Sequence, residues 1–300
     1  MFLSDVIIQL THIPPKEVTP IKILKGAMLG ILSGAVSPIP GVSSGTLFVF
    51  FNIYEEFFQE ASFENLKKNI PLLISFVIGT AIGIVGVSHI ILHLLTNHAI
   101  LMYFSFIGLI LGCIPMIYKK ATVQKVKHGN VTIFIVALSF MIFLTFTSGS
   151  DYANQSLEQL GGLTPLIGIW VFVASFISST AMLIPGVGGS VMMLAFGTYT
   201  IYIEAISSLD PIVLPILLIS MVLGILVSIK VIKGLLVTHP QTLYGAILGF
   251  MIGSVFLVFP GFSFNLEGFF AIVAMSTCGV FSYYLTKKEP PKSADNSQIS

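Results

Sequence analysis

The chain has 300 residues, of which 55% are hydrophobic and only 9% are charged, and its mean hydropathy is +0.98. Soluble domains carry about 25% charged residues, so this composition excludes a soluble fold and indicates a polytopic membrane protein built from helices. All 14 basic residues are lysines, which excludes a phosphate clamp made of arginine, and the net charge of +1 gives no indication of nucleic-acid binding.

The N-terminal segment 1–21 contains Asp5 and the pair Pro14–Pro15, and no basic stretch precedes its apolar residues. We therefore expect a surface segment there rather than a cleaved signal peptide. Further along, a membrane-spanning helix needs about 20 apolar residues. Uninterrupted apolar runs of suitable length occur at 70–95, 99–118, 131–147, 211–235, 240–259 and 268–286.

Two further apolar stretches, 22–58 and 163–206, are each interrupted midway by proline and glycine. Their halves are 22–37 with 45–58, and 163–183 with 189–206. Since most of these halves are short for a full crossing, the pattern predicts two broken hairpins that re-enter the membrane. Two full crossings per stretch have the same parity and stay open as the alternative.

Lysine placement predicts the orientation. If each broken stretch returns to the side from which it entered, all 14 lysines fall on one side of the membrane. The loops on the other side, at 96–98, 148–162, 206–210 and 260–267, contain no lysine. Because lysine favours the cytoplasmic side, we expect both termini to be cytoplasmic, including the tail 287–300.

The sequence repeats itself. The stretch Ile39–Val42 recurs 145 residues later as Ile184–Val187. At the same offset Tyr54 and Gly79 match Tyr199 and Gly224, and at an offset of 141 the set His98, Tyr103, Gly108 and Gly112 matches His239, Tyr244, Gly249 and Gly253. We predict two repeats in a single membrane domain, 22–147 and 163–286, each a broken hairpin followed by three spans. An odd number of crossings inverts the second repeat, an arrangement typical of secondary transporters.

The first break contains the run Gly41-Val42-Ser43-Ser44-Gly45, which fits the G-x-S-x-G pattern of a nucleophilic serine. In the second copy Gly188 takes the place of Ser43, and the flanking residues read as helices rather than as a strand and a helix. The pattern therefore favours a helix break over a nucleophile, and an intramembrane lipid-phosphate hydrolase is the least favoured interpretation.

A broken membrane helix leaves N–H groups unpaired where its second half begins, and these groups attract an anion. Such backbone is tolerated at membrane depth only where it is buried in protein or lines a wet cavity. The predicted substrate-binding residues are Pro40, Gly41, Ser43, Ser44, Gly45, Thr46, Pro185, Gly186, Gly188, Gly189 and Ser190. The alternative is that these glycines only allow helices to pack closely.

The segments GAVSPIPGVSSGTLFVFFNIYEE and AMLIPGVGGSVMMLAFGTY resemble the paired motifs of the PopT polyprenyl-phosphate transporter family, over about residues 20–288. This resemblance implies a flippase that returns undecaprenyl phosphate from the outer to the cytoplasmic leaflet of a bacterial membrane, for reuse in wall synthesis. The matching positions are Pro40, Gly41, Ser43, Gly45, Thr46, Tyr54, Glu55, Pro185, Gly186, Gly189, Ser190 and Tyr199. Ser44 and Gly188 depart from the motifs, and Ser37 stands where an acidic residue is expected.

Glu55, together with Tyr54 and Tyr199, is a candidate for ion coupling or gating, although Glu55 by its position can also lie at the membrane interface. His89 and His93 share a helix face, but no third ligand is evident, so we predict no metal and no cofactor.

The chain has no "GK" dipeptide and hence no Walker A loop, which leaves passive exchange or coupling to a proton or cation gradient. A transporter of a small soluble anion fits the same helix-end physics and is the main alternative function. The oligomeric state stays open.

Overall fold

The computed structural model describes residues 19–37, 43–61, 66–123, 128–147, 156–208, 210–261 and 265–287. Within these ranges the chain forms twelve helices and no strand. Six of these helices are long and apolar enough to cross a membrane, which confirms the predicted all-α polytopic fold. Pro40, Gly41 and most of the segments 1–21 and 287–300 lie outside the described residues.

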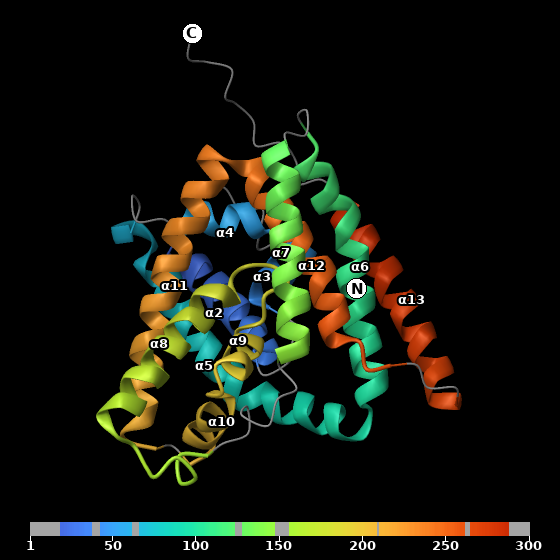
Figure 1. Ribbon diagram of the computed structural model, residues 1–300. Coiled ribbons are helices and arrows are strands. Elements are labelled where there is room, and N and C mark those ends of the chain that lie inside the picture. The colour runs from blue at the N-terminus through green and yellow to red at the C-terminus, as the bar shows by residue number, and fades with distance from the viewer. Residues whose placement is uncertain are drawn as a thin grey trace.

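The helices fall into two sets of six that follow the same order (Figure 1). The first set is α2 (Thr19–Val36), α3 (Ser44–Phe50), α4 (Tyr54–Glu60), α5 (Leu66–Asn97), α6 (Ala99–Ala121) and α7 (His128–Thr147). The second set is α8 (Pro165–Met182), α9 (Gly189–Ala195), α10 (Tyr199–Ser207), α11 (Val213–Thr238), α12 (Pro240–Val258) and α13 (Leu266–Lys287).

The second half of each broken stretch is itself divided, so the predicted continuous helices 45–58 and 189–206 are wrong. The chain turns out of α3 at Asn52, with φ 55°, and out of α9 at Gly197, with φ 69°. The next residue then bonds back to the helix, Ile53 N to Phe48 O at 2.8 Å and Thr198 N to Met193 O at 2.9 Å. This is the Schellman helix end, and asparagine and glycine are the residues that tolerate its left-handed backbone.

The long helices pack in matching pairs. α2 lies against α5 and α8 against α11, while α6 lies against α13 and α7 against α12. Gly108 of α6 sits on the backbone of Met275, and its repeat partner Gly249 of α12 sits on the backbone of Phe134, because neither position has room for a side chain. The last helix of each half, α7 or α13, therefore packs against a helix of the other half.

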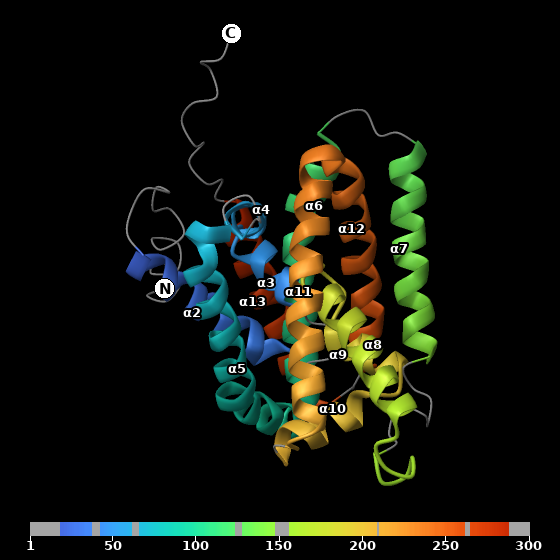
Figure 2. The same ribbon diagram turned by 90° about the vertical axis from the view of Figure 1, so that its left-hand side faces the viewer.

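The long helices run in both directions along the molecule. In Figures 1 and 2, α6, α11 and α13 run toward one end of the molecule, whereas α5, α7 and α12 run away from it. We call this end the lysine end, since it is marked by lysines in the C-terminal parts of α6, α11 and α13: Lys119, Lys120, Lys230, Lys233 and Lys287.

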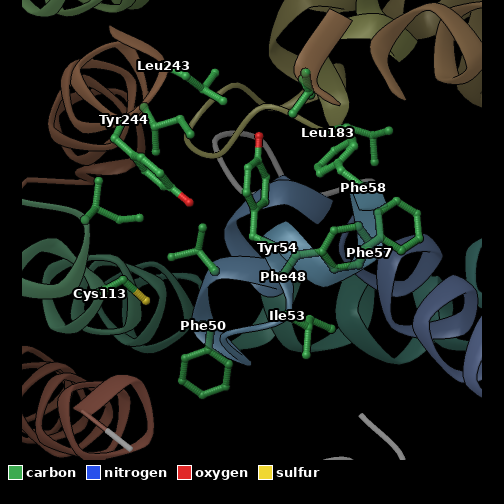
Figure 3. Close-up of a cluster of buried hydrophobic side chains, with 14 of the residues drawn as sticks. Phe48, Phe50, Ile53, Tyr54, Phe57, Phe58, Cys113, Leu183, Leu243 and Tyr244 are labelled. Carbon is green, nitrogen blue, oxygen red and sulfur yellow. The ribbon is translucent and has the colours of Figure 1, made fainter. Parts of the chain in front are cut away.

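The largest buried cluster surrounds α3 and α4 (Figure 3). Phe48 of α3 packs on Phe57 of α4, with ring centroids 4.5 Å apart, and Phe57 packs on Phe76 of α5 at 5.1 Å. Leu183, at the end of α8, belongs to the same cluster. Packed aromatic rings thus fix α3 and α4 against the start of the second break.

Candidate functional site

The two helix breaks meet in the interior of the molecule. Ser43 Oγ donates a hydrogen bond to Ile184 O at 3.0 Å, and Gly186 N donates to Thr46 Oγ1 at 3.0 Å. The Ser43 and Thr46 hydroxyls lie 2.9 Å apart. Residues that are 140 or more positions apart in the chain are therefore tied together at one buried point. We call the contact between residues 43–46 and 183–186 the hairpin junction.

Local sequence explains the shape of the junction on the α3 side. Ser43 has extended backbone (φ −116°, ψ 155°) and accepts from Thr46 N at 3.1 Å, so it is the N-cap of α3. A Cβ on Gly45 would lie 2.6 Å from Pro185 N, so only glycine allows the two breaks to approach this closely.

The second break relies on backbone conformation rather than on a capping side chain. Gly188 is the N-cap of α9 and makes no side-chain cap. Gly186 has φ 85°, and a Cβ there would lie 2.5 Å from Met251 N on α12. Gly186 is thus required both by its left-handed backbone and by the close approach of α12.

The other predicted residues lie around this contact. Ser44 occupies the buried first turn of α3, Ser190 the buried first turn of α9, and Pro185 is buried between α8 and α9. Gly189 is half-buried at the start of α9. Pro40 and Gly41 lie outside the described residues.

Several buried hydroxyls near the breaks have no hydrogen-bond partner within the described part of the chain. They belong to Ser33 on α2, Ser44 on α3 and Ser178 on α8. Ser33 and Ser178 are 145 residues apart, the offset of the repeat, yet sequence reasoning did not single them out. Because native proteins rarely bury unpaired hydroxyls, such groups need an explanation, and a ligand is one.

The first turn of α4 holds two ion pairs. Glu55 Oε1 accepts from Lys120 Nζ at 2.8 Å and also from the Tyr244 hydroxyl, and Glu56 Oε1 pairs with the buried Lys25 Nζ at 2.6 Å. Burial raises the pKa of the Glu55 carboxyl, but the Lys120 charge and the two hydrogen bonds outweigh it, so the pKa lies below its ordinary value. Sequence reasoning selected Glu55 but missed its partners Lys120 and Tyr244, and it missed the pair of Lys25 with Glu56.

Other features lie away from the junction. Glu204 on α10 is exposed, and the His89 and His93 side chains lie outside the described residues. The residues that the structure describes include no cluster of three or more His, Cys, Asp or Glu able to hold a metal. An apolar hollow of about 520 Å³ lies between α8 and α11, lined by residues that include Gly168, Phe172 and Ile216.

The profile of one protein family, described as undecaprenyl phosphate translocase-like, matches residues 33–268. This chain belongs to that family. The polyprenyl-phosphate transporter of Staphylococcus aureus is 32% identical to it over 271 residues, 86% of this chain and 93% of the relative. The polyprenyl-phosphate transporter of Vibrio cholerae serotype O1 is 26% identical over 247 residues, 77% of this chain and 76% of the relative. No solved structure matches.

Membership of the undecaprenyl phosphate translocase-like family confirms the resemblance expected from the paired glycine motifs. The family consists of transporters, so this member is not an enzyme and the nucleophile interpretation of Ser43 is wrong. The geometry agrees, because the Ser43 hydroxyl is buried and already bonded to Ile184 and Thr46.

Proposed function

We propose that this chain moves polyprenyl phosphate between the leaflets of a bacterial cytoplasmic membrane, and that the phosphate group crosses at the hairpin junction. The direct hydrogen bonding between the two breaks is the observation that carries this proposal. One break from each half meets the other at a single point, as a substrate site shared between two repeats requires.

The two halves are inverted repeats in this proposal. Matching Schellman ends at Asn52 and Gly197, matching glycine contacts at Gly108 and Gly249, and opposite helix directions support it. Each break then approaches the junction from its own side of the membrane, as a re-entrant hairpin does. Because the repeats are inverted, exchanging their conformations would expose the junction to one side and then to the other.

The substrate donors are the buried hydroxyls of Ser33, Ser44 and Ser178, together with Ser190 and the backbone at the starts of α3 and α9. A phosphate at membrane depth must recover the hydrogen bonds that it had in water, or its desolvation is too costly. The Ser33, Ser44 and Ser178 hydroxyls, which have no partner among the described residues, can supply such bonds without breaking the hydrogen bond between Ser43 and Ile184.

The lysine end faces the cytoplasm in this proposal, and transport proceeds from the outer leaflet toward it. Lysines at the ends of spans favour that side, and they attract the anionic headgroups of the cytoplasmic leaflet. The lipid phosphate is thereby delivered to the side on which it is reused in wall synthesis.

The test is reconstitution of the purified chain in liposomes that contain undecaprenyl phosphate. We expect the lipid phosphate to move between leaflets, the uncharged undecaprenol to gain nothing from the protein, and inorganic phosphate to stay outside. Uptake of inorganic phosphate without movement of the lipid would favour a transporter of soluble anions. Movement of neither would contradict the proposal.

A further inference from the structure

At the lysine end, apart from the hairpin junction, two donors from different helices hold one carboxylate. One oxygen of Glu55 accepts from both Lys120 Nζ, at 2.8 Å, and the Tyr244 hydroxyl. Lys120 ends α6 in the first half of the chain, and Tyr244 lies on α12 in the second half. An ammonium and a phenol that converge on a single anionic oxygen are donors of the kind that bind a phosphate oxygen.

A third donor adjoins this site. The Tyr54 hydroxyl is buried and has no hydrogen-bond partner among the residues that the structure describes, and the residue as a whole is only 3% exposed. The Tyr244 side chain extends from α12 toward Tyr54 in the same buried cluster (Figure 3). A carboxylate held by Lys120 and Tyr244 leaves this third donor unused.

The cations at this site are neutralised by the protein itself. Lys120 pairs with Glu55 and the buried Lys25 pairs with Glu56, so adjacent residues in one turn of α4 cover both charges. The Glu55 side chain is 45% exposed, and a carboxylate displaced from Lys120 can therefore return to water at little cost. Lys25, with its side chain 7% exposed, could not lose its partner so cheaply.

We infer that Lys120, Tyr244 and Tyr54 form a second binding site for the phosphate monoester group at the lysine end, and that Glu55 occupies it until the substrate arrives. This inference rests on the proposed function, because it assigns the place where the transported phosphate is received before release. A phosphate dianion carries more charge and more acceptor oxygens than a carboxylate, so it displaces Glu55 and also engages Tyr54.

Displacement of Glu55 also breaks the Lys120 and Tyr244 contacts that join α4 to α6 and α12, while the packing of Phe57 on Phe48 and Phe76 keeps α4 in place. The pair of Glu55 with Lys120 has no charged counterpart at the repeat positions of the second half. At the repeat positions of Glu55 and Lys120 the second half has Thr200 and Gly261, which carry no charge. Arrival of the phosphate at the lysine end thereby removes the polar contacts between α4 and the neighbouring helices α6 and α12, and the repeat positions at the opposite end have no charged pair to break.

The direction in which Glu55→Gln changes the affinity for phosphate tests the inference. The detergent-solubilised full-length chain is titrated with undecaprenyl phosphate and, in a separate arm, with inorganic phosphate, and the dissociation constant is measured by thermophoresis. Glu55→Gln removes the resident anion, so the lipid phosphate should bind several-fold more tightly. Lys120→Met and Tyr244→Phe each remove a charge-assisted donor, so they should weaken binding about tenfold or more.

Lys119→Met is the matched control, since Lys119 is an exposed lysine in the same helical turn, and it should leave binding unchanged. Tighter binding of both ligands by Glu55→Gln indicates a site that recognises the phosphate group alone. Tighter binding of the lipid only indicates a site that also contacts the isoprenoid chain. Either result supports the inference. Unchanged or weaker binding by Glu55→Gln would overturn it, as would unchanged binding by Tyr244→Phe. If wild-type proteoliposomes still move the lipid, the proposed function survives that failure.

Discussion

Ser43 and Thr46 each join one helix break to the other as well as shaping α3. Ser43 caps α3 by accepting from Thr46 N and also donates to Ile184 O, and Thr46 accepts from Gly186 N. The turn that sequence reasoning compared with a catalytic serine is thus a structural tie between the two halves of the chain. Polar groups that are hydrogen-bonded to each other in this way stabilise the junction. The hydroxyls that we propose as substrate donors are other ones.

Thr46→Val tests the hydrogen bond that joins Thr46 to Gly186 across the two breaks. Valine keeps the shape but leaves the buried Gly186 N–H without its acceptor, which we expect to cost about 1–3 kcal/mol of stability. The apparent melting temperature in detergent should fall, and transport in proteoliposomes should fall with it. Thr145→Val is the control, because the Thr145 hydroxyl donates to Met141 of its own helix, and it should change both quantities far less.

Ser33→Ala and Ser178→Ala should separate transport from stability. Neither hydroxyl has a partner in the described ranges, so removing it costs no protein hydrogen bond and the melting temperature should hold or rise. Transport should fall about tenfold if each hydroxyl donates to the phosphate. Ser179→Ala, which loses a bond to Ser175 in its own helix, is the control. Normal transport by both variants would remove these serines from the substrate site.

At the scale of the element, the helix ends at Asn52 and Gly197 are the least expected feature. Each chain half turns at the same place after a seven-residue helix, and each turn needs left-handed backbone. This second break places Glu55 in the first turn of a separate helix, beside Lys120, instead of near the end of one longer helix.

Gly197→Ala should destabilise the protein because a left-handed residue with a Cβ costs about 1–2 kcal/mol. At the repeat position Asn52 has φ 55°, a left-handed backbone that asparagine tolerates better than alanine does. Equal melting temperatures for Gly197→Ala and the wild type would show that this turn does not need its left-handed conformation.

At the scale of the whole molecule, apolar length and the repeat predicted most of the architecture. Spans such as 99–118 and 240–259 agree with α6 and α12 to within a few residues, because an uninterrupted apolar run has one stable form in a membrane. The contact between the two breaks was expected from the proposed inversion of the repeats. The bonds of Ser43 to Ile184 and of Glu55 to Lys120 were not predictable, since they depend on how distant helices pack.

The orientation is also testable at this scale. Asn265 precedes α13 at the lysine-free end, and Val123 follows α6 at the lysine end with 74% of its surface exposed. In a background in which Cys113 and Cys278 are replaced by alanine, Asn265→Cys should react with an impermeant thiol reagent on intact cells, and Val123→Cys should react only after lysis. The reverse pattern would invert the proposed topology.

The central claim is that the phosphate group crosses where the two helix breaks meet. The most direct measurement is the rate at which undecaprenyl phosphate moves between leaflets in proteoliposomes of the wild type, Gly45→Ala and Gly234→Ala. An added Cβ at Gly45 would lie 2.6 Å from Pro185 N and forces the breaks apart, whereas at Gly234 on α11 it meets nothing within 4 Å. With all three proteins monodisperse and equally helical, the account predicts that Gly45→Ala loses most transport and Gly234→Ala keeps it. Transport by Gly45→Ala at the wild-type rate would contradict it.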